Sequence, residues 1–181
     1  MSRQYLADAP YSDPMIVSAS AIVATTESAL VPVVAQYTPI PASDARAGKV
    51  YKLTMGGIYS TGASGTLTIT PRYGTSTGGV TFGASVAQTV PVSITGAPWF
   101  LEAFLTFRTV NNGTATSSTA MCHGAFWGAG VAATAASSCV VPFGGTSATV
   151  DTTTASGLWI GWTLSVAGSV TTESIIWQSL T

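Results

Sequence analysis

Short runs in which apolar and polar residues alternate recur along most of the chain. In the run 157–167, Leu158, Ile160, Trp162 and Leu164 occupy every second position. Because successive side chains of a β-strand point to opposite faces, this period of two places the four residues on one face of a strand. The alternation therefore predicts strands that turn one face toward a core.

Turn residues bound these runs, and the two signals together predict the secondary structure. Gly, Pro, Asn, Ser and Thr separate the runs, and the alanine-rich stretch at 129–136 is interrupted by Gly130 and Thr134, which favours a loop over a helix. Strands spaced about 10–20 residues apart indicate an all-β fold, an antiparallel β-sandwich of jelly-roll kind. The predicted strands lie near 20–25, 29–38, 49–60, 65–73, 86–94, 98–110, 115–128, 138–142, 147–152, 157–167 and 172–180.

The N-terminal 20 residues differ from the rest of the chain. Residues 1–20 contain Pro10 and Pro14 and show no regular period, so they are predicted to form an extended N-terminal arm. Residues 21–181 are predicted to form a single β-sandwich domain, since 181 residues match one domain. In an assembly we expect the arm to order on a neighbouring subunit, with Tyr5, Tyr11, Met15 and Ile16 as candidate interface residues.

The chain carries unusually little charge. Asp, Glu, Lys and Arg make up 7% of the residues, against about 25% in a typical soluble domain. No run of about 18 apolar residues is present, so neither a transmembrane helix nor a membrane partner is predicted. Because interface cores are depleted in charge, a subunit of a protein assembly is favoured over the alternative, a soluble β-domain with a Ser- and Thr-rich surface.

The basic residues are too few and too scattered for nucleic-acid binding. Six Lys and Arg residues and seven Asp and Glu residues give a net charge of −1. Only Arg46, Lys49 and Lys52 lie close together in the sequence, whereas binding to phosphates needs a dense positive surface. No nucleic-acid partner is predicted.

The predicted strand at 98–110 has large apolar residues on both faces. Its second face carries Phe100 and Phe104 together with Glu102 and Arg108. A half-apolar outer face indicates cover by another subunit or by a loop of the same chain. These four residues are candidate interface residues, and Glu102 is expected to pair with Arg108 or another basic group.

No catalytic, cofactor-binding or metal-binding set of residues is predicted. The single histidine, His123, directly follows Cys122, so the two side chains should point to opposite faces of a strand and are badly placed to chelate one metal ion. The seven carboxylates share no short motif. The glycine-rich pieces at 74–79 and 143–146 lack the lysine of a phosphate-binding loop and are interpreted as hairpin turns. The protein is therefore predicted not to be an enzyme.

Cysteine and tryptophan each allow two interpretations. Cys122 and Cys139 are expected to be free thiols rather than a disulfide, because the N-terminus shows no secretory signal. The five tryptophans are expected to anchor the core or an interface, with a sugar-stacking platform as the alternative.

Residues 45–110 carry four short motifs in order. It reads G-x-x-Y-x-L at 48–53, then paired glycines at 56–57, then L-x-I-x-x-R-x-G at 67–74, and finally L-E-x-x-L-T-x-R at 101–108. In this order the segments resemble small virion proteins of tailed bacteriophages, which are encoded among the head and tail structural genes.

This resemblance implies a β-sandwich subunit, often trimeric, that decorates the capsid or belongs to the tail, collar or spike. It implies a virion protein on the particle exterior, made in the host cytoplasm, with the major capsid protein and further copies of itself as partners. We expect a head decoration or cement protein that stabilises the mature lattice. The alternative is a tail, collar or spike subunit whose β-sandwich binds a host-surface glycan.

Overall fold

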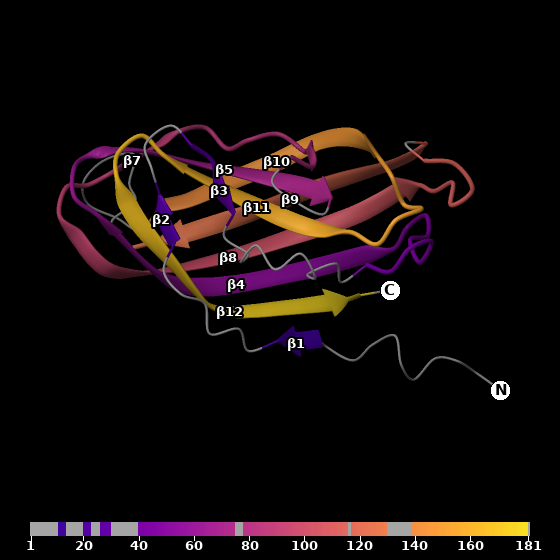
Figure 1. The fold of residues 1–181 in the computed structure, drawn as a ribbon, viewed down its shortest axis with the longest axis horizontal. Helices are drawn as coiled ribbons and strands as arrows, with labels where there is room; N and C mark the ends of the chain where they lie inside the picture. Colours follow the sequence, from indigo (N-terminus) through magenta and orange to yellow (C-terminus); the bar gives the residue numbers. More distant parts are fainter. Residues whose placement is uncertain are drawn as a thin grey trace.

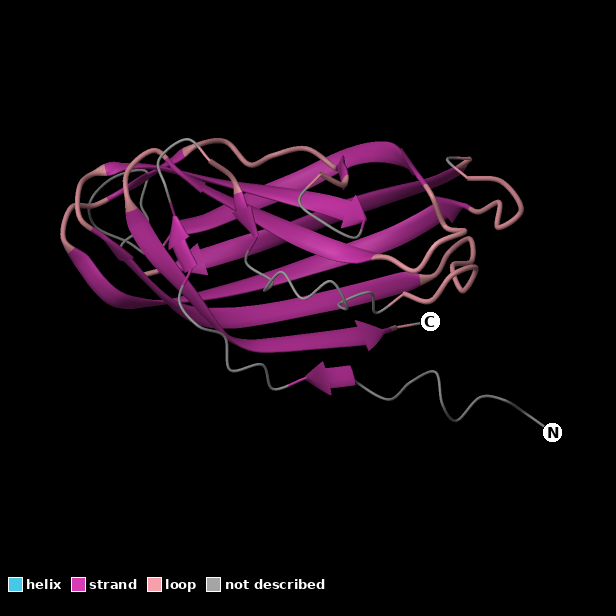
Figure 2. Cartoon of the chain, in the orientation of Figure 1, coloured by secondary structure: helices cyan, strands magenta, loops and turns pink. Residues whose placement is uncertain are grey.

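The computed structural model describes residues 11–13, 20–22, 26–29, 40–74, 78–115, 117–129 and 139–180, which form two antiparallel β-sheets packed face to face (Figure 1). These residues contain no helix (Figure 2), so the predicted all-β sandwich is confirmed and none of the described segments is a helix able to cross a membrane. The larger sheet contains β1 (Tyr11–Asp13), β2 (Ser20–Ile22), β4 (Val50–Thr61), β8 (Ile94–Thr109), β9 (Ser118–Gly128), β10 (Cys139–Val150) and β12 (Gly168–Ser179). The smaller sheet contains β3 (Ser28–Ala29), β5 (Gly65–Gly74), β6 (Val80–Thr81), β7 (Gln88–Val90) and β11 (Gly157–Leu164).

The order of strands places the long strands of the larger sheet side by side. They follow the order β1-β12-β4-β8-β9-β10, with β2 also paired with β12, while the smaller sheet follows β3-β11-β5-β6, with β7 also paired with β5. Every one of these pairings is antiparallel. The predicted jelly-roll connectivity is not confirmed by this order, because β8, β9 and β10 are successive neighbours in one sheet.

The core forms from alternate residues of the long strands, as the period of two predicts. In β4, Tyr51, Leu53 and Met55 are buried, and in β8 every second residue from Trp99 to Phe107 is buried. Because a one-residue slip would turn all these side chains outward, burial fixes the register of the sheet.

Aromatic rings join the two sheets at the centre of this core. Trp162 of the smaller sheet is fully buried, and its ring centroid lies 5.1 Å from that of Phe126, 5.7 Å from that of Tyr59 and 6.2 Å from that of Trp99. These three partners belong to β9, β4 and β8, and all are buried on the inner face of the larger sheet. Trp162 therefore contacts several strands at once, and its volume holds the sheets at their spacing.

Strand β11 is buried on both faces, which the alternation alone does not predict. Trp159 is only 2% exposed, and its indole Nε1 donates a hydrogen bond to the Gly74 carbonyl at 2.5 Å. Beside it, Arg72 donates from Nε and Nη2 to the two carboxylate oxygens of Glu27, each at 2.7 Å. Gly161 makes room for this pair, since a Cβ there would lie 1.8 Å from Glu27 Oε1. A bidentate ion pair thus covers part of the outer face of the smaller sheet.

The hairpin turn predicted at 143–146 is wrong. Cys139–Val150 is one strand, β10, which pairs with β9 on both sides of an irregularity between Gly144 and Ser147. Gly144 and Gly145 have φ of 81° and 94°, a conformation that glycine adopts without steric cost. The two glycines therefore mark a β-bulge inside a strand rather than its end. The turn predicted at 74–79 agrees with the antiparallel pairing of β5 with β6, although residues 75–77 lie outside the described part.

Among the described residues, both edges of the larger sheet are covered in part. Along β10, Gly144 N–H donates to the Gly83 carbonyl at 3.1 Å, Thr146 N–H donates to the Phe82 carbonyl at 3.0 Å, and Pro142 has no N–H to donate. At the opposite edge, β1 and β2 pair with β12. Covered or proline-bearing edges resist pairing with strands of another molecule.

Little of the predicted N-terminal arm falls within the described residues. Tyr11–Asp13 pairs antiparallel with residues 175–177 of β12. Tyr5, Met15 and Ile16 lie outside the described residues, as do the side chain of Tyr11 and most of the strand predicted at 29–38. The arm and its interface role therefore stay predictions.

Candidate functional site

The outer face of the larger sheet exposes a group of aromatic and aliphatic side chains. The register aligns Phe100 of β8 with Trp127 of β9 and Val140 of β10, and it aligns Phe104 with His123. The ring centroids of Phe100 and Trp127 lie 5.4 Å apart, and those of Phe104 and His123 lie 5.6 Å apart in a stacked arrangement. We call this group the outer aromatic patch and define it as Phe100, Phe104, His123, Trp127, Val140 and Pro142.

Between the two aromatic rows lies a trough. The intervening row consists of Glu102, Ala125 and Pro142, which are aligned across β8, β9 and β10. The small side chain of Ala125 leaves a hollow with a volume of about 400 Å³, walled by Phe104 and His123 on one side and by Trp127 on the other. The patch thus has two ridges of rings separated by a groove one residue row wide.

The charged residues of this face neutralise one another. Glu102 forms an ion pair with Lys52 of β4, so its partner is this lysine and not Arg108. The Lys52 ammonium also lies 5.7 Å from the centroid of the Phe104 ring. Phe100, Glu102 and Phe104 share the outer face as predicted, whereas Arg108 is exposed near the end of β8.

Cys122 and His123 point to opposite faces of β9, as predicted. Cys122 is a free, fully buried thiol, and burial raises its pKa far above the ordinary value, which suppresses the nucleophilic thiolate. Cys139 pairs with Gly128, six positions along β9, which places it about 20 Å from Cys122. A disulfide needs Cα atoms within about 7 Å, so these two cysteines do not form one within the chain.

Among the described residues no cluster of His, Cys, Asp and Glu has the composition of a metal site.

The tryptophans divide into four buried residues and one that is partly exposed. Trp99, Trp159, Trp162 and Trp177 are at most 4% exposed, which confirms them as core residues. Only Trp127 is partly exposed, so the five do not form one sugar-stacking platform. His123, Trp127, Val140 and Pro142 were not predicted to join Phe100 and Phe104, because strand register is invisible in the sequence.

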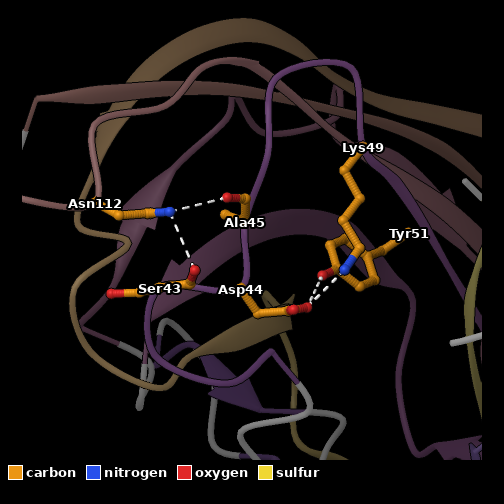
Figure 3. A network of polar contacts seen from close by, with 6 residues as sticks. All are labelled: Ser43, Asp44, Ala45, Lys49, Tyr51 and Asn112. Atoms are coloured by element: carbon orange, nitrogen blue, oxygen red, sulfur yellow. Dashed lines mark hydrogen bonds and ion pairs between the residues drawn. The ribbon is translucent and has the colours of Figure 1, made fainter. Parts of the chain in front are cut away.

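A second group of polar contacts lies at one end of the sandwich. In Figure 3, Lys49 and Tyr51 converge on Asp44, and Asn112 lies between the carbonyls of Ser43 and Ala45. Lys49 Nζ donates to Asp44 Oδ2 at 2.6 Å and the Tyr51 hydroxyl donates to the same oxygen at 3.0 Å. These donors tie the 40–49 loop to β4, and nothing in their geometry offers an open site for a ligand.

The Asp44 contacts predict an acid-dependent loss of stability. The hydrogen bond from Lys49 lowers the pKa of Asp44 below its ordinary value of 3.8, against the opposing effect of burial. A carboxyl group with a lowered pKa contributes stability above its unfolded-state pKa, and this contribution disappears as the pH falls through the folded-state pKa. We therefore expect Asp44→Asn to lower the urea midpoint at pH 7, and the difference from the wild type to shrink as the pH falls through the lowered pKa of Asp44. A difference that stays the same as the pH falls would contradict this.

Comparison of the chain with known proteins gives no information on the outer aromatic patch. No family model, no curated protein and no solved structure matches this chain. The likeness of residues 45–110 to virion proteins of tailed phages thus remains a resemblance in pattern.

Proposed function

We propose that this chain is a non-enzymatic structural subunit of a tailed-phage virion, a capsid decoration or cement protein that binds the mature head lattice on the particle exterior. Its partners in this proposal are the major capsid protein and further copies of itself, in a homotrimer. The pattern at residues 45–110 and the low charge of the chain support this function.

The observation that carries the proposal is the exposed apolar surface on the outer face of the larger sheet. Phe100 is 43% exposed and Val140 is 49% exposed, beside the partly exposed ring of Trp127. Contiguous apolar patches on soluble proteins mark interaction sites. A chain with 7% charged residues is suited to having much of its surface covered by neighbours.

Stabilisation of a capsid would follow from mass action. A protein that binds the mature lattice and not the unassembled shell protein shifts the equilibrium toward the lattice. A trimer placed at threefold positions would multiply contacts that are individually weak. This role requires a matching surface and no reactive group.

Binding to heads tests this proposal directly. Purified protein is mixed with mature heads that lack it and with unexpanded proheads of the same phage, and each mixture is sedimented. We expect saturable binding to mature heads and little binding to proheads. Removal of residues 1–10, which leaves β1 in place, should weaken binding if the N-terminal segment is a tether. Failure to bind either particle would contradict the decoration role.

The trough gives a specific reason to keep the second candidate, a tail, collar or spike subunit that binds a host-surface glycan. Its volume of about 400 Å³ lies within the usual range of ligand pockets, about 300–1,000 Å³. The ring of Trp127 offers a face for a sugar. A glycan array decides between the two, since specific binding that Trp127→Ala abolishes would favour the glycan function.

A further inference from the structure

We infer that the outer aromatic patch is the surface through which copies of this chain bind one another. The inference names the interface of the proposed homo-oligomer and rests on that part of the proposed function. It commits to a second copy of the chain as the occupant of the patch.

The shape of the patch is self-complementary. One ridge is formed by Phe100 and Trp127 and the other by Phe104 and His123, with the trough over Ala125 between them. Rows two residues apart along a strand are about 7 Å apart, and packed sheets stand about 10 Å apart. A ridge of a second copy therefore has the width needed to fill the trough, while its own trough receives a ridge in return.

The charges of the patch are self-complementary as well. Lys52 and Glu102 pair across β4 and β8, so the centre of the face carries one positive and one negative group. A second copy brings the same two groups, and Lys52 of each copy can meet Glu102 of the other. Two like-charged faces would repel each other, whereas this neutral pair allows close approach.

The area of the face matches the requirement of a stable interface. The five long strands, at about 4.8 Å spacing, span roughly 20 Å, and a strand as long as β9, with 11 residues, extends roughly 37 Å. The projected area of about 700 Å² is close to the ~800 Å² that each partner contributes to a standard interface. The patch lies on β8, β9 and β10, so an interface of this size also includes the outer faces of β4 and β12.

The surroundings of the patch favour a protein partner over a sugar. In the trough, the Glu102 carboxylate is paired with Lys52 and one face of the His123 ring lies on Phe104, while Ala125, Pro142 and Phe143 add apolar side chains. A sugar needs several hydrogen-bonding groups, while a second copy supplies rings and aliphatic groups.

The mass of the purified protein in solution tests the inference. A face that packs against its own copy joins subunits in pairs. We therefore expect light scattering after size exclusion to give two subunits of 18.3 kDa at micromolar concentration, or six where the pairs join the proposed trimers. Phe100→Glu places a charge on a ridge and should halve the mass. The matched control is Val86→Glu, which adds the same charge at a residue 78% exposed outside the patch and should leave the mass unchanged.

Fluorescence provides a second readout that needs no disruptive variant. Trp127 is the partly exposed tryptophan, while the other four are at most 4% exposed. Dilution that separates the copies should therefore raise acrylamide quenching, and Trp127→Phe should abolish this change. A wild-type mass of one or three subunits of 18.3 kDa, a Phe100→Glu variant that keeps the oligomeric mass, or quenching independent of dilution would each overturn the inference. If Trp127 is protected from acrylamide only when the protein binds to heads, the patch contacts the shell protein. This result would also overturn the inference. Binding to heads is measured separately, so a monomer that binds heads refutes this interface and leaves the decoration role intact.

Discussion

Replacing Trp162 by alanine is expected to destabilise the fold by about 3–5 kcal/mol, the range for truncating a large buried aromatic side chain. Trp162 is fully buried against Phe126, Tyr59 and Trp99. Within the described residues its indole Nε1 has no hydrogen-bond partner, so packing and not hydrogen bonding is lost. Since domains are stable by about 5–15 kcal/mol, the variant should lose a large share of its stability in a urea titration.

Trp127→Ala is the matched control for this variant. It removes the same side chain from the outer face, where the ring is partly exposed, so we expect a much smaller change in the free energy of unfolding. Comparable losses for Trp127→Ala and Trp162→Ala would show that the sheets do not pack around Trp162. The comparison is made in the Phe100→Glu background, in which the proposed interface is broken, because Trp127 also belongs to that interface.

Gly57→Ala is expected to cost about 1–3 kcal/mol, the usual penalty for forcing an extra group into a packed site. A Cβ at Gly57 would lie 1.9 Å from the backbone oxygen of Thr171 and 3.1 Å from the Cα of Thr172. Both atoms belong to the backbone of β12, next to the irregularity between Thr172 and Ser174. The clash cannot be relieved by rotating a side chain, so the β4–β12 ladder must shift.

Gly62→Ala is the control for Gly57→Ala. No heavy atom lies within 4 Å of a Cβ at Gly62, so the unfolding midpoint should be unchanged or slightly raised, because alanine restricts the unfolded chain. A thermal melt of the two variants checks this. An unchanged melting temperature for Gly57→Ala would contradict the close approach of β4 and β12.

The long strands were predictable because their alternation is strong. The predictions at 49–60 and 65–73 agree closely with β4 and β5, since Tyr51, Leu53 and Leu67 are inward and buried as the period of two requires. The strand β10 was divided in two, because a glycine pair has the same composition in a bulge as in a turn. Alternation alone places Trp159 on the outer face of β11; its burial agrees with the expectation that the tryptophans anchor the core or an interface, because β11 is buried on both faces.

The outer aromatic patch was only half predictable. Phe100 and Phe104 were found because both lie on the second face of one strand. Trp127 and Val140 come from other strands, and the register that aligns them with Phe100 is set by contacts between strands distant in sequence. Likewise, Lys52 lies 50 residues from Glu102, so their pairing depends on the β4–β8 register.

The copy number of this protein in purified virions tests the proposed function most directly. Quantitative mass spectrometry measures it relative to the major capsid protein. The decoration role predicts hundreds of copies per particle, as expected for a subunit that covers the shell at its symmetry positions. A few dozen copies or fewer would place the protein in the tail, collar or spike instead, and its absence from purified particles would contradict the virion role altogether.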